Sequence, residues 1–101
     1  VVLSLLREGD SYGYAMVKRI DELSNGNISW KEGMLYPLLH RLERQGLIES
    51  YSATGASGRA RKYYRLLPKG AHELVVERRN LSAVYDLFAA LDTAKNGLRH
   101  A

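Results

Sequence analysis

The spacing of apolar residues predicts two helices in the first quarter of the chain. Residues 2–6 form the start of a short helix that ends at Gly9. A second helix follows, which Asp10 or Ser11 can cap and which residues 25–26, Asn-Gly, end. Its apolar residues recur at helical spacing and predict one buried face, formed by Met16, Val17, Ile20 and Leu23.

A third helix is expected from Trp30 to Gly46. Ser29 and Glu32 form a capping-box pattern, in which each side chain bonds a backbone N–H at the start of the helix. Pro37 lacks the N–H that would complete the helical ladder, so we expect a kink near Gly33. One side of this helix is apolar and consists of Leu35, Leu38, Leu39 and Leu42. The other side is polar and basic, with Gly33, Pro37, His40, Arg41 and Arg44.

After Gly46 the apolar pattern becomes that of strands. Residues 48–52 and 62–67 are rich in aliphatic, aromatic and β-branched side chains, and the small and polar residues 53–61 lie between them. This pattern predicts a two-stranded hairpin with a flexible tip. Pro68 then suits the first turn of a last helix, which we expect to run through at least Leu91 and to stop at residues 96–97, Asn-Gly.

The composition limits the possible classes of protein. A chain of 101 residues that is 46% hydrophobic fits one small domain, which a second subunit would help to stabilise. The absence of cysteine excludes a disulfide scaffold and thiolate chemistry, and indicates the cytoplasm. We find no membrane-spanning apolar run and no catalytic, metal or cofactor motif, so we expect no enzyme, no metal and no cofactor. Because Val1 is not a methionine, we expect natural residues to precede it.

The net charge of +4 is concentrated in the middle third of the chain. Residues 31–65 carry seven basic and three acidic side chains, whereas residues 1–30 sum to −1 and residues 66–101 to +1. A basic segment with interleaved tyrosines is typical of a protein that binds the nucleic-acid backbone, although a solvated basic face has the same composition. The third helix and the hairpin therefore become the candidate binding elements.

Three helices, a hairpin and a long helix form the element order of a winged helix-turn-helix. We therefore predict a mainly α (α+β) fold, with residues 1–67 as a DNA-binding domain and residues 68–101 as a C-terminal dimerisation helix, together forming one compact unit. In this fold a polar helix enters the major groove, and the wing contacts the flanking phosphates. Operator DNA is the partner that this order and the charge pattern both indicate.

Five motifs carry a resemblance to a known family. They are Tyr12-Gly13-Tyr14, residues 33–43, residues 46–48, residues 58–66 and Gly70. Over residues 3 to about 75, the chain resembles the PadR family of bacterial transcriptional regulators, in the short form with a single C-terminal helix. The resemblance implies a homodimeric, sequence-specific DNA-binding repressor. Alternatives are a repressor of the same family that senses drugs or phenolic compounds, and a winged helix that binds another protein.

Three positions depart from the usual family pattern. Met34 replaces a threonine or serine, Ala60 replaces a proline of the wing, and Leu67 replaces a threonine that caps the last helix. The first change removes a hydroxyl expected near the DNA, so the operator preference of relatives does not carry over. The other two loosen the wing and remove a cap worth about 1 kcal/mol.

On the helices, three residues are the main candidates for base contacts. His40 and Arg41 lie opposite the leucines, where they reach the groove unless this face is simply solvated. Tyr36 flanks the leucines, so it either packs against the wing or reads a base. Tyr14 and Trp30 are expected to pack in the core or at its boundary.

On the wing, the cations beside the hairpin tip are expected to contact phosphates. Arg59, Arg61 and Lys62 cluster next to small residues, where a charge cluster has few structural roles. With the helical candidates, the predicted DNA-binding set is Tyr12, Lys18, Lys31, Gly33, Met34, Tyr36, His40, Arg41, Arg59, Arg61 and Lys62.

The last helix carries apolar residues at heptad spacing. The predicted dimer seam consists of Leu74, Leu81, Val84, Phe88 and Leu91, part of which packs on its own domain. A two-fold dimer suits DNA, because it presents two recognition helices to successive major grooves. The resemblance also implies a pocket for a small aromatic effector at the interface, lined here by Tyr85 and Phe88, although a dry interface uses the same residues.

Overall fold

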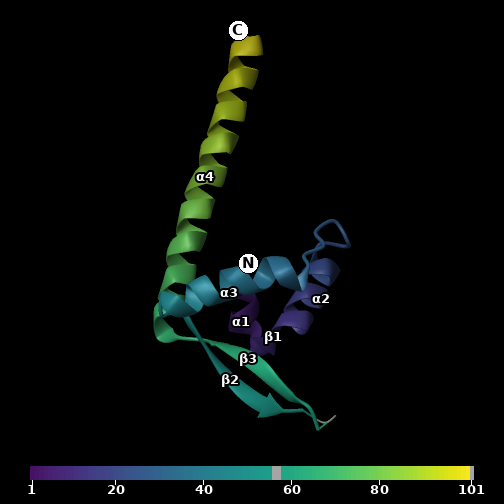
Figure 1. Cartoon of the computed structure of the whole chain (residues 1–101). Helices are drawn as coiled ribbons and strands as arrows, with labels where there is room; N and C mark the ends of the chain where they lie inside the picture. The colour runs from purple at the N-terminus through teal and green to yellow at the C-terminus, as the bar shows by residue number, and fades with distance from the viewer. Residues whose placement is uncertain (56–57, 101) are drawn as a thin grey trace.

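The computed structural model describes residues 1–55 and 58–100. It is a winged helix-turn-helix with a long C-terminal helix, as predicted, and Figure 1 shows the arrangement of its elements. In chain order these are α1 (Val2–Glu8), β1 (Ser11–Tyr12), α2 (Gly13–Leu23), α3 (Glu32–Arg44), β2 (Ile48–Thr54), β3 (Ala60–Leu66) and α4 (Pro68–His100).

The core lies where the first three helices meet the sheet and the start of α4. In α3, Leu35 and Leu39 are fully buried and Leu38 and Leu42 are partly buried, which confirms the apolar side predicted for this helix. The prediction for α2 is wrong at Leu23, which is 57% exposed because it borders an open groove at the end of the helix. The buried hydrophobic residues are Val2, Leu3, Leu5, Leu6, Met16, Ile20, Leu35, Leu39, Leu47, Ile48, Tyr64 and Leu74.

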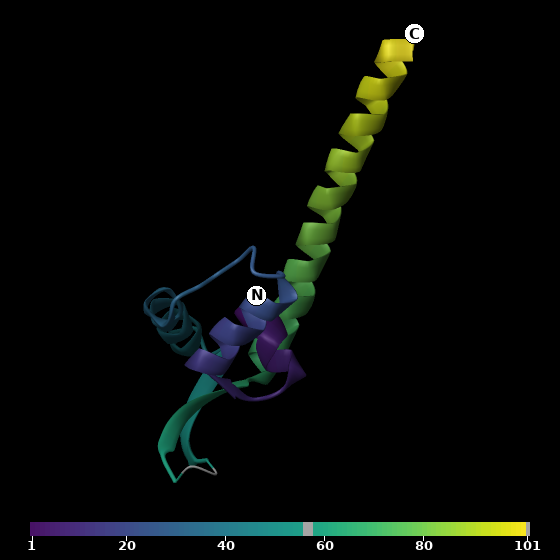
Figure 2. The same cartoon turned by 90° about the vertical axis from the view of Figure 1, so that its right-hand side faces the viewer.

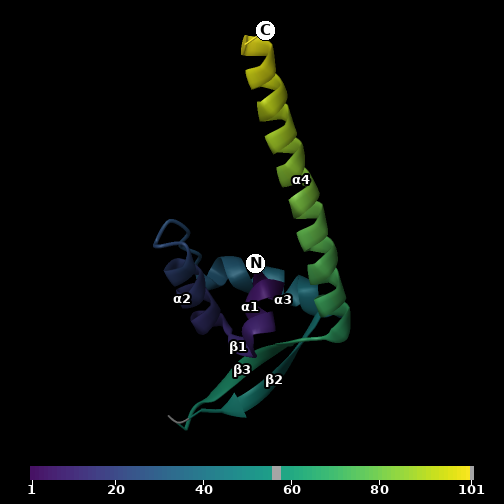
Figure 3. The same cartoon turned by 180° about the vertical axis from the view of Figure 1, so that it is seen from behind.

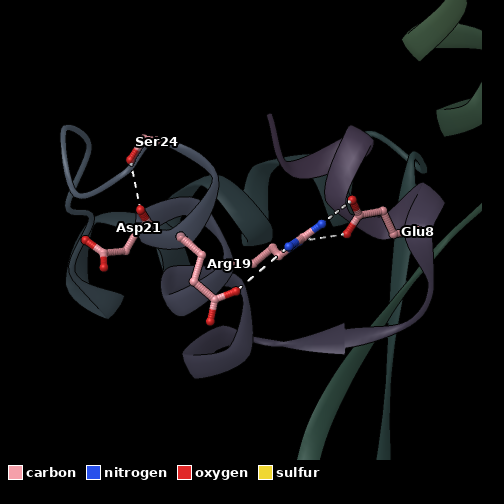
Figure 4. A network of polar contacts seen from close by, with 5 residues as sticks. Glu8, Arg19, Asp21 and Ser24 are labelled. Carbon is pink, nitrogen blue, oxygen red and sulfur yellow. Dashed lines mark hydrogen bonds and ion pairs between the residues drawn. The ribbon is translucent and has the colours of Figure 1, made fainter.

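An ion pair joins α1 to α2 beside this core. The Arg19 guanidinium donates to both carboxylate oxygens of Glu8, each at 3.2 Å, and Figure 4 shows Arg19 reaching across to Glu8. Glu22 lies 3.8 Å from the same guanidinium. Because these side chains are about half exposed, the network orients the two helices more than it stabilises them.

Two helix starts differ from the prediction. α2 begins at Gly13, after β1, so Asp10 and Ser11 do not cap it, and Asp10 accepts a hydrogen bond from the Tyr51 hydroxyl instead, at 2.6 Å. α3 begins at Glu32 without a side-chain cap, so the predicted capping box is wrong. Trp30 packs against the core from the extended segment before α3, as expected of a boundary residue. Its burial outweighs a cap worth about 1 kcal/mol.

The sheet has three antiparallel strands in the order β1-β3-β2, one more than predicted. β1 pairs with the central strand β3 through Ser11 opposite Tyr64 and Tyr12 opposite Tyr63. β2 and β3 pair from Ile48 opposite Leu66 as far as Thr54 opposite Ala60. The strands are therefore longer, and the tip of the wing shorter, than the pattern of small residues predicted. Such residues lower strand propensity but do not prevent pairing.

A tight joint connects the end of α3 to the start of α4. The Leu67 N–H donates to the Leu47 carbonyl at 3.0 Å, and Lys69 Nζ donates to the Gln45 carbonyl at 2.8 Å. At Gly70 an added Cβ would lie 2.1 Å from the Leu47 carbonyl oxygen, so only glycine fits there. The connections that follow α3 and β3 thus both contact the first turn of α4.

α4 begins at Pro68, as predicted, and runs to His100, so the predicted stop at residues 96–97 is wrong. Asparagine and glycine weaken a helix by up to about 1 kcal/mol each without ending it. Most of α4 projects from the domain on the side away from the wing (Figures 2 and 3). The radius of gyration is accordingly 18.2 Å, against about 13 Å for a compact chain of this size.

Only the first turns of α4 belong to the core. Leu74 is 3% exposed and packs within its own chain, which corrects its assignment to the dimer seam. Every side chain from residue 77 to residue 94 is exposed. No described helix has both the length and the apolarity that crossing a bilayer requires.

Candidate nucleic-acid interface

A cleft of about 330 Å³ opens between the start of α2, the start of α3 and the wing. Four elements contribute to it, because β1 brings the α1–α2 connection beside β3. The lining residues are Tyr12, Tyr14, Glu32, Tyr36, Arg61 and Lys62. Four of the predicted DNA-binding residues therefore meet in one place: Tyr12, Tyr36, Arg61 and Lys62.

Tyr36 packs against the start of α2. A Cβ at Gly13 would lie 2.9 Å from the Tyr36 hydroxyl oxygen, so the glycine of the Tyr-Gly-Tyr motif makes room for the phenol. Burial raises the pKa of the Tyr36 hydroxyl, and the Glu32 carboxylate adds to the effect. At neutral pH this hydroxyl is therefore protonated and is a hydrogen-bond donor of a residue that lines the cleft.

Tyr14 was expected in the core, and the structure shows that this expectation is wrong. Its side chain is 54% exposed and lines the cleft, because α2 begins at Gly13 and directs Met16 and Ile20 to the core instead. Lys18, one turn later, places its ammonium 5.5 Å from the centre of the Tyr14 ring. The spacing of Tyr14 and Lys18 by four residues was the signal for this pair.

The remaining candidates on α3 divide between two sides of the helix. Gly33, Met34 and His40 are exposed, as is Lys31 just before the helix, and the space around Gly33 is open. The His40 ring lies 6.5 Å from the Tyr36 ring, which places it on the side of the cleft. Arg41 is exposed beside residues of α1 and α4 instead, so the structure does not bring it to the cleft.

The wing presents its cations to solvent. Arg59, Arg61 and Lys62 are all exposed. Arg61 and Lys62 lie on opposite faces of β3, with Arg61 over the Tyr12 ring and Lys62 over the Tyr64 ring. The ion pairs among the described residues involve Arg19 and Arg65, so none of the three wing cations forms an ion pair with a described carboxylate. The charge of Lys62 acts on Glu43 without a direct contact and helps to lower the pKa of that carboxylate.

Glu43 fastens α3 to the wing, a role that the sequence reasoning missed. Its Oε2 accepts hydrogen bonds from the Ser50 N–H at 3.1 Å and from the Ser50 hydroxyl at 2.5 Å. The hydroxyl bond holds the pKa of Glu43 below its ordinary value. Nothing in the local pattern pairs an acid at the end of one helix with a serine in the following strand.

The predicted seam and effector residues of α4 lie on its projecting part. Leu81, Val84, Phe88 and Leu91 are exposed, and so is Tyr85. Tyr85 is 75% exposed and Phe88 is 63% exposed, so an effector pocket at these residues stays a prediction that requires a second subunit. Leu81 borders an apolar groove of about 540 Å³ between α1, α2 and α4.

This chain is similar to other proteins both in sequence and in structure. A protein of Lysinibacillus sphaericus is 36% identical over 91 residues, which cover 87% of this chain and 84% of that protein. The structure of a transcriptional regulator from Clostridium thermocellum superposes with a TM-score of 0.78 at 34% identity and covers 86% of this chain and 84% of that one.

A structure of Bacillus subtilis PadR in complex with operator DNA is also similar, with a TM-score of 0.64 and 30% identity. The match covers 72% of this chain and 41% of that one, so this chain spans under half the length of that relative. The transcriptional regulator PadR-like family matches residues 2–76, from the start of α1 into α4. The chain therefore belongs to the PadR-like family of transcriptional regulators, as its motifs indicated.

Proposed function

We propose that this protein is a homodimeric, sequence-specific DNA-binding repressor that acts in the cytoplasm, where bacterial operators lie. The observation that carries the proposal is the meeting of three tyrosines with Arg61 and Lys62 in one open cleft beside α3. Cations such as Arg61 and Lys62 bind phosphates, and hydroxyl donors such as those of Tyr14 and Tyr36 hold a backbone in register. The operator complex of Bacillus subtilis PadR supports the same use of the fold.

The two sides of the cleft have different tasks in this proposal. The exposed Gly33, Met34 and His40 face the major groove from α3, where a methionine suits the methyl group of thymine and a histidine suits a base edge. Arg59, Arg61 and Lys62 hold phosphates from the wing. Tyr36 supports the cleft by packing and offers its hydroxyl to the backbone.

The exposed apolar residues of α4 support a homodimer. The positions of these residues in the sequence are symmetric about residue 86. Leu81 and Leu91 are each five residues from it, Val84 and Phe88 two residues, and Tyr85 and Leu87 one residue. An antiparallel pair of α4 helices with its two-fold axis level with residue 86 therefore buries each of these side chains against an apolar one. A two-fold dimer suits DNA, because it presents one recognition helix to each of two successive major grooves, which lie about 34 Å apart.

Binding to native promoter fragments at several salt concentrations tests the proposal. Joint replacement of Arg59, Arg61 and Lys62 by alanine should weaken specific and non-specific binding alike and lower the salt slope by about one unit per lost phosphate contact. His40→Ala should change the ranking of operator variants instead. The wild type should also reduce transcription from the bound promoter. A triple variant that keeps its affinity and its salt slope would contradict the proposed placement of the wing.

A further inference from the structure

Three tyrosines form one row across the outer face of the sheet. Tyr12 of β1 and Tyr51 of β2 both lie opposite Tyr63 of the central strand. The Tyr12 and Tyr63 rings meet edge to face at 5.3 Å, and the Tyr51 and Tyr63 rings stack at 5.7 Å. Such cross-strand aromatic contacts fix the rings relative to one another, so the row is a rigid platform.

An arginine covers each end of the row, and the two ends differ in charge balance. At one end Arg65 lies 4.8 Å from the centre of the Tyr51 ring and pairs with Glu49 at 2.7 Å, while the Tyr51 hydroxyl bonds Asp10. At the other end Arg61 lies 4.5 Å from the centre of the Tyr12 ring, and no described carboxylate pairs with it. Only the Arg61 end therefore carries an uncompensated cation, and it borders the cleft.

A long arginine side chain loses rotamer freedom when it binds a phosphate, and this loss weakens binding. An aromatic face under the guanidinium restricts the side chain before DNA arrives and leaves its N–H groups available at the rim of the plane. The Tyr12 ring has this position under Arg61, and its edge-to-face contact with the Tyr63 ring restrains it.

We propose that Tyr12 is a positioning residue, whose ring holds the Arg61 guanidinium ready for a phosphate of the DNA backbone. Its ring face, rather than its hydroxyl, makes this contribution. The inference rests on the proposed DNA-binding function and refines it, because it assigns Tyr12 an indirect contribution through Arg61.

A double-mutant cycle tests this role with a duplex of random sequence as the probe, since backbone binding does not require the operator. Arg61→Ala should weaken binding about tenfold and lower the salt slope by about one unit. Tyr12→Ile, which suits a strand, should weaken binding about two- to fivefold in the wild type and leave the Arg61→Ala variant nearly unchanged. Tyr12→Phe keeps the ring and should bind like the wild type.

Tyr51→Ile is the matched control, because it removes a ring of the same row whose arginine is already paired with Glu49. It should lower thermal stability as Tyr12→Ile does, with no change in the salt slope. If Tyr12→Ile fails to fold, an upfield ring-current shift of the Arg61 δ protons is expected in the free wild type and in Tyr12→Phe.

Additive effects of Tyr12→Ile and Arg61→Ala, a loss in Tyr12→Phe equal to that in Tyr12→Ile, or unshifted Arg61 δ protons would overturn the inference. If the wild type binds duplex DNA and Tyr12→Ile binds it equally well, the inference about Tyr12 is refuted and the proposed function is not. A wild type that binds no duplex refutes the proposed function together with it.

Discussion

The winged domain and the projecting part of α4 contain similar apolar residues in opposite environments. In the winged domain Leu35 and Leu39 are fully buried, whereas on α4 Leu81 is 70% exposed and Tyr85 is 75% exposed. Leu74 and Leu81 belong to one heptad series, yet the first lies in the core and the second in solvent. Periodicity therefore shows that a face is to be buried, but not whether its own chain or a partner covers it.

The exposed face is too large to be a minor feature of the surface. Burying an aliphatic or aromatic side chain of this size stabilises a protein by about 1.5–3 kcal/mol, so the six exposed side chains between residues 81 and 91 represent on the order of 10 kcal/mol. Contiguous apolar surface of this kind is typical of an interface. The winged domain folds on its own core, while the proposed partner of α4 is a second copy of α4.

The largest effect is expected at the centre of the core. Leu39→Ala should destabilise the protein by about 2–5 kcal/mol, because it leaves a cavity among rigid neighbours. For a domain of this size the melting temperature should fall by about 10 °C or more. Leu23→Ala is the matched control on an exposed side chain and should cost less than about 1 kcal/mol. Stability is measured by urea unfolding. Equal losses of unfolding free energy in Leu39→Ala and Leu23→Ala would contradict the contrast between the buried and the exposed leucine.

On α4 the corresponding change should affect assembly rather than the fold of the domain. Joint replacement of Leu81 and Phe88 by aspartate places four carboxylates in the dimer interface and should raise the dimer dissociation constant at least a hundredfold, about 2.7 kcal/mol. Sedimentation should show a wild-type dimer at micromolar concentration and a monomeric variant. A wild type that stays monomeric contradicts the assignment of this face.

Cross-linking sharpens the same prediction, since the chain has no cysteine of its own. In the proposed antiparallel register, a mixture of Leu81→Cys chains and Leu91→Cys chains should form disulfide-linked pairs, because position 81 of one chain faces position 91 of the other. Each single-cysteine chain alone should cross-link much less. Strong self-linking at position 81 would indicate a parallel pair instead.

A smaller effect is expected where α3 meets the wing. Ser50→Ala removes a hydroxyl bond to Glu43 and should cost about 1–2 kcal/mol at neutral pH. Because folding lowers the pKa of Glu43, this stabilisation is complete above the ordinary value of 4.5 and is lost as the pH falls through the lowered pKa. Unfolding measured from pH 7 to pH 3 should show the gap between variant and wild type closing at the acidic end. A gap independent of pH would show that the carboxylate charge is not involved.

The smallest effect is expected at Tyr64, a fully buried residue whose hydroxyl has no hydrogen-bond partner among the described residues. Tyr64→Phe removes an unsatisfied polar group without opening a cavity, so stability should stay within about 0.5 kcal/mol of the wild type or rise. Urea unfolding measures this difference. A loss above about 1 kcal/mol would mean that the hydroxyl is satisfied in solution.

Sequence reasoning identified the helices, the hairpin, Pro68 as the start of α4 and most of the core. It missed β1, because two residues cannot show a strand period, and it therefore placed the start of α2 too early and Tyr14 in the core. It overestimated two local signals, each worth about 1 kcal/mol. The capping box predicted at residues 29–32 does not form, because Trp30 packs against the core there, and the Asn-Gly pair at residues 96–97 does not end α4. Of the residues that line the candidate cleft it named Tyr12, Tyr36, Arg61 and Lys62, whose DNA contacts stay a prediction, and it did not foresee the Glu43–Ser50 contact.

The tight joint at Leu47 and Gly70 couples α3 to α4, so the two helices should rotate together. Three contacts hold the joint: Leu67 with Leu47, Lys69 with Gln45, and Gly70 with Leu47. From this joint α4 extends about 50 Å, at 1.5 Å per residue. A rotation of about 5° at this joint then moves the far end of α4 by about 4 Å. In the proposed dimer, a shift of a few ångströms between the paired α4 helices would change the angle at which α3 meets the major groove, and with it the affinity for DNA.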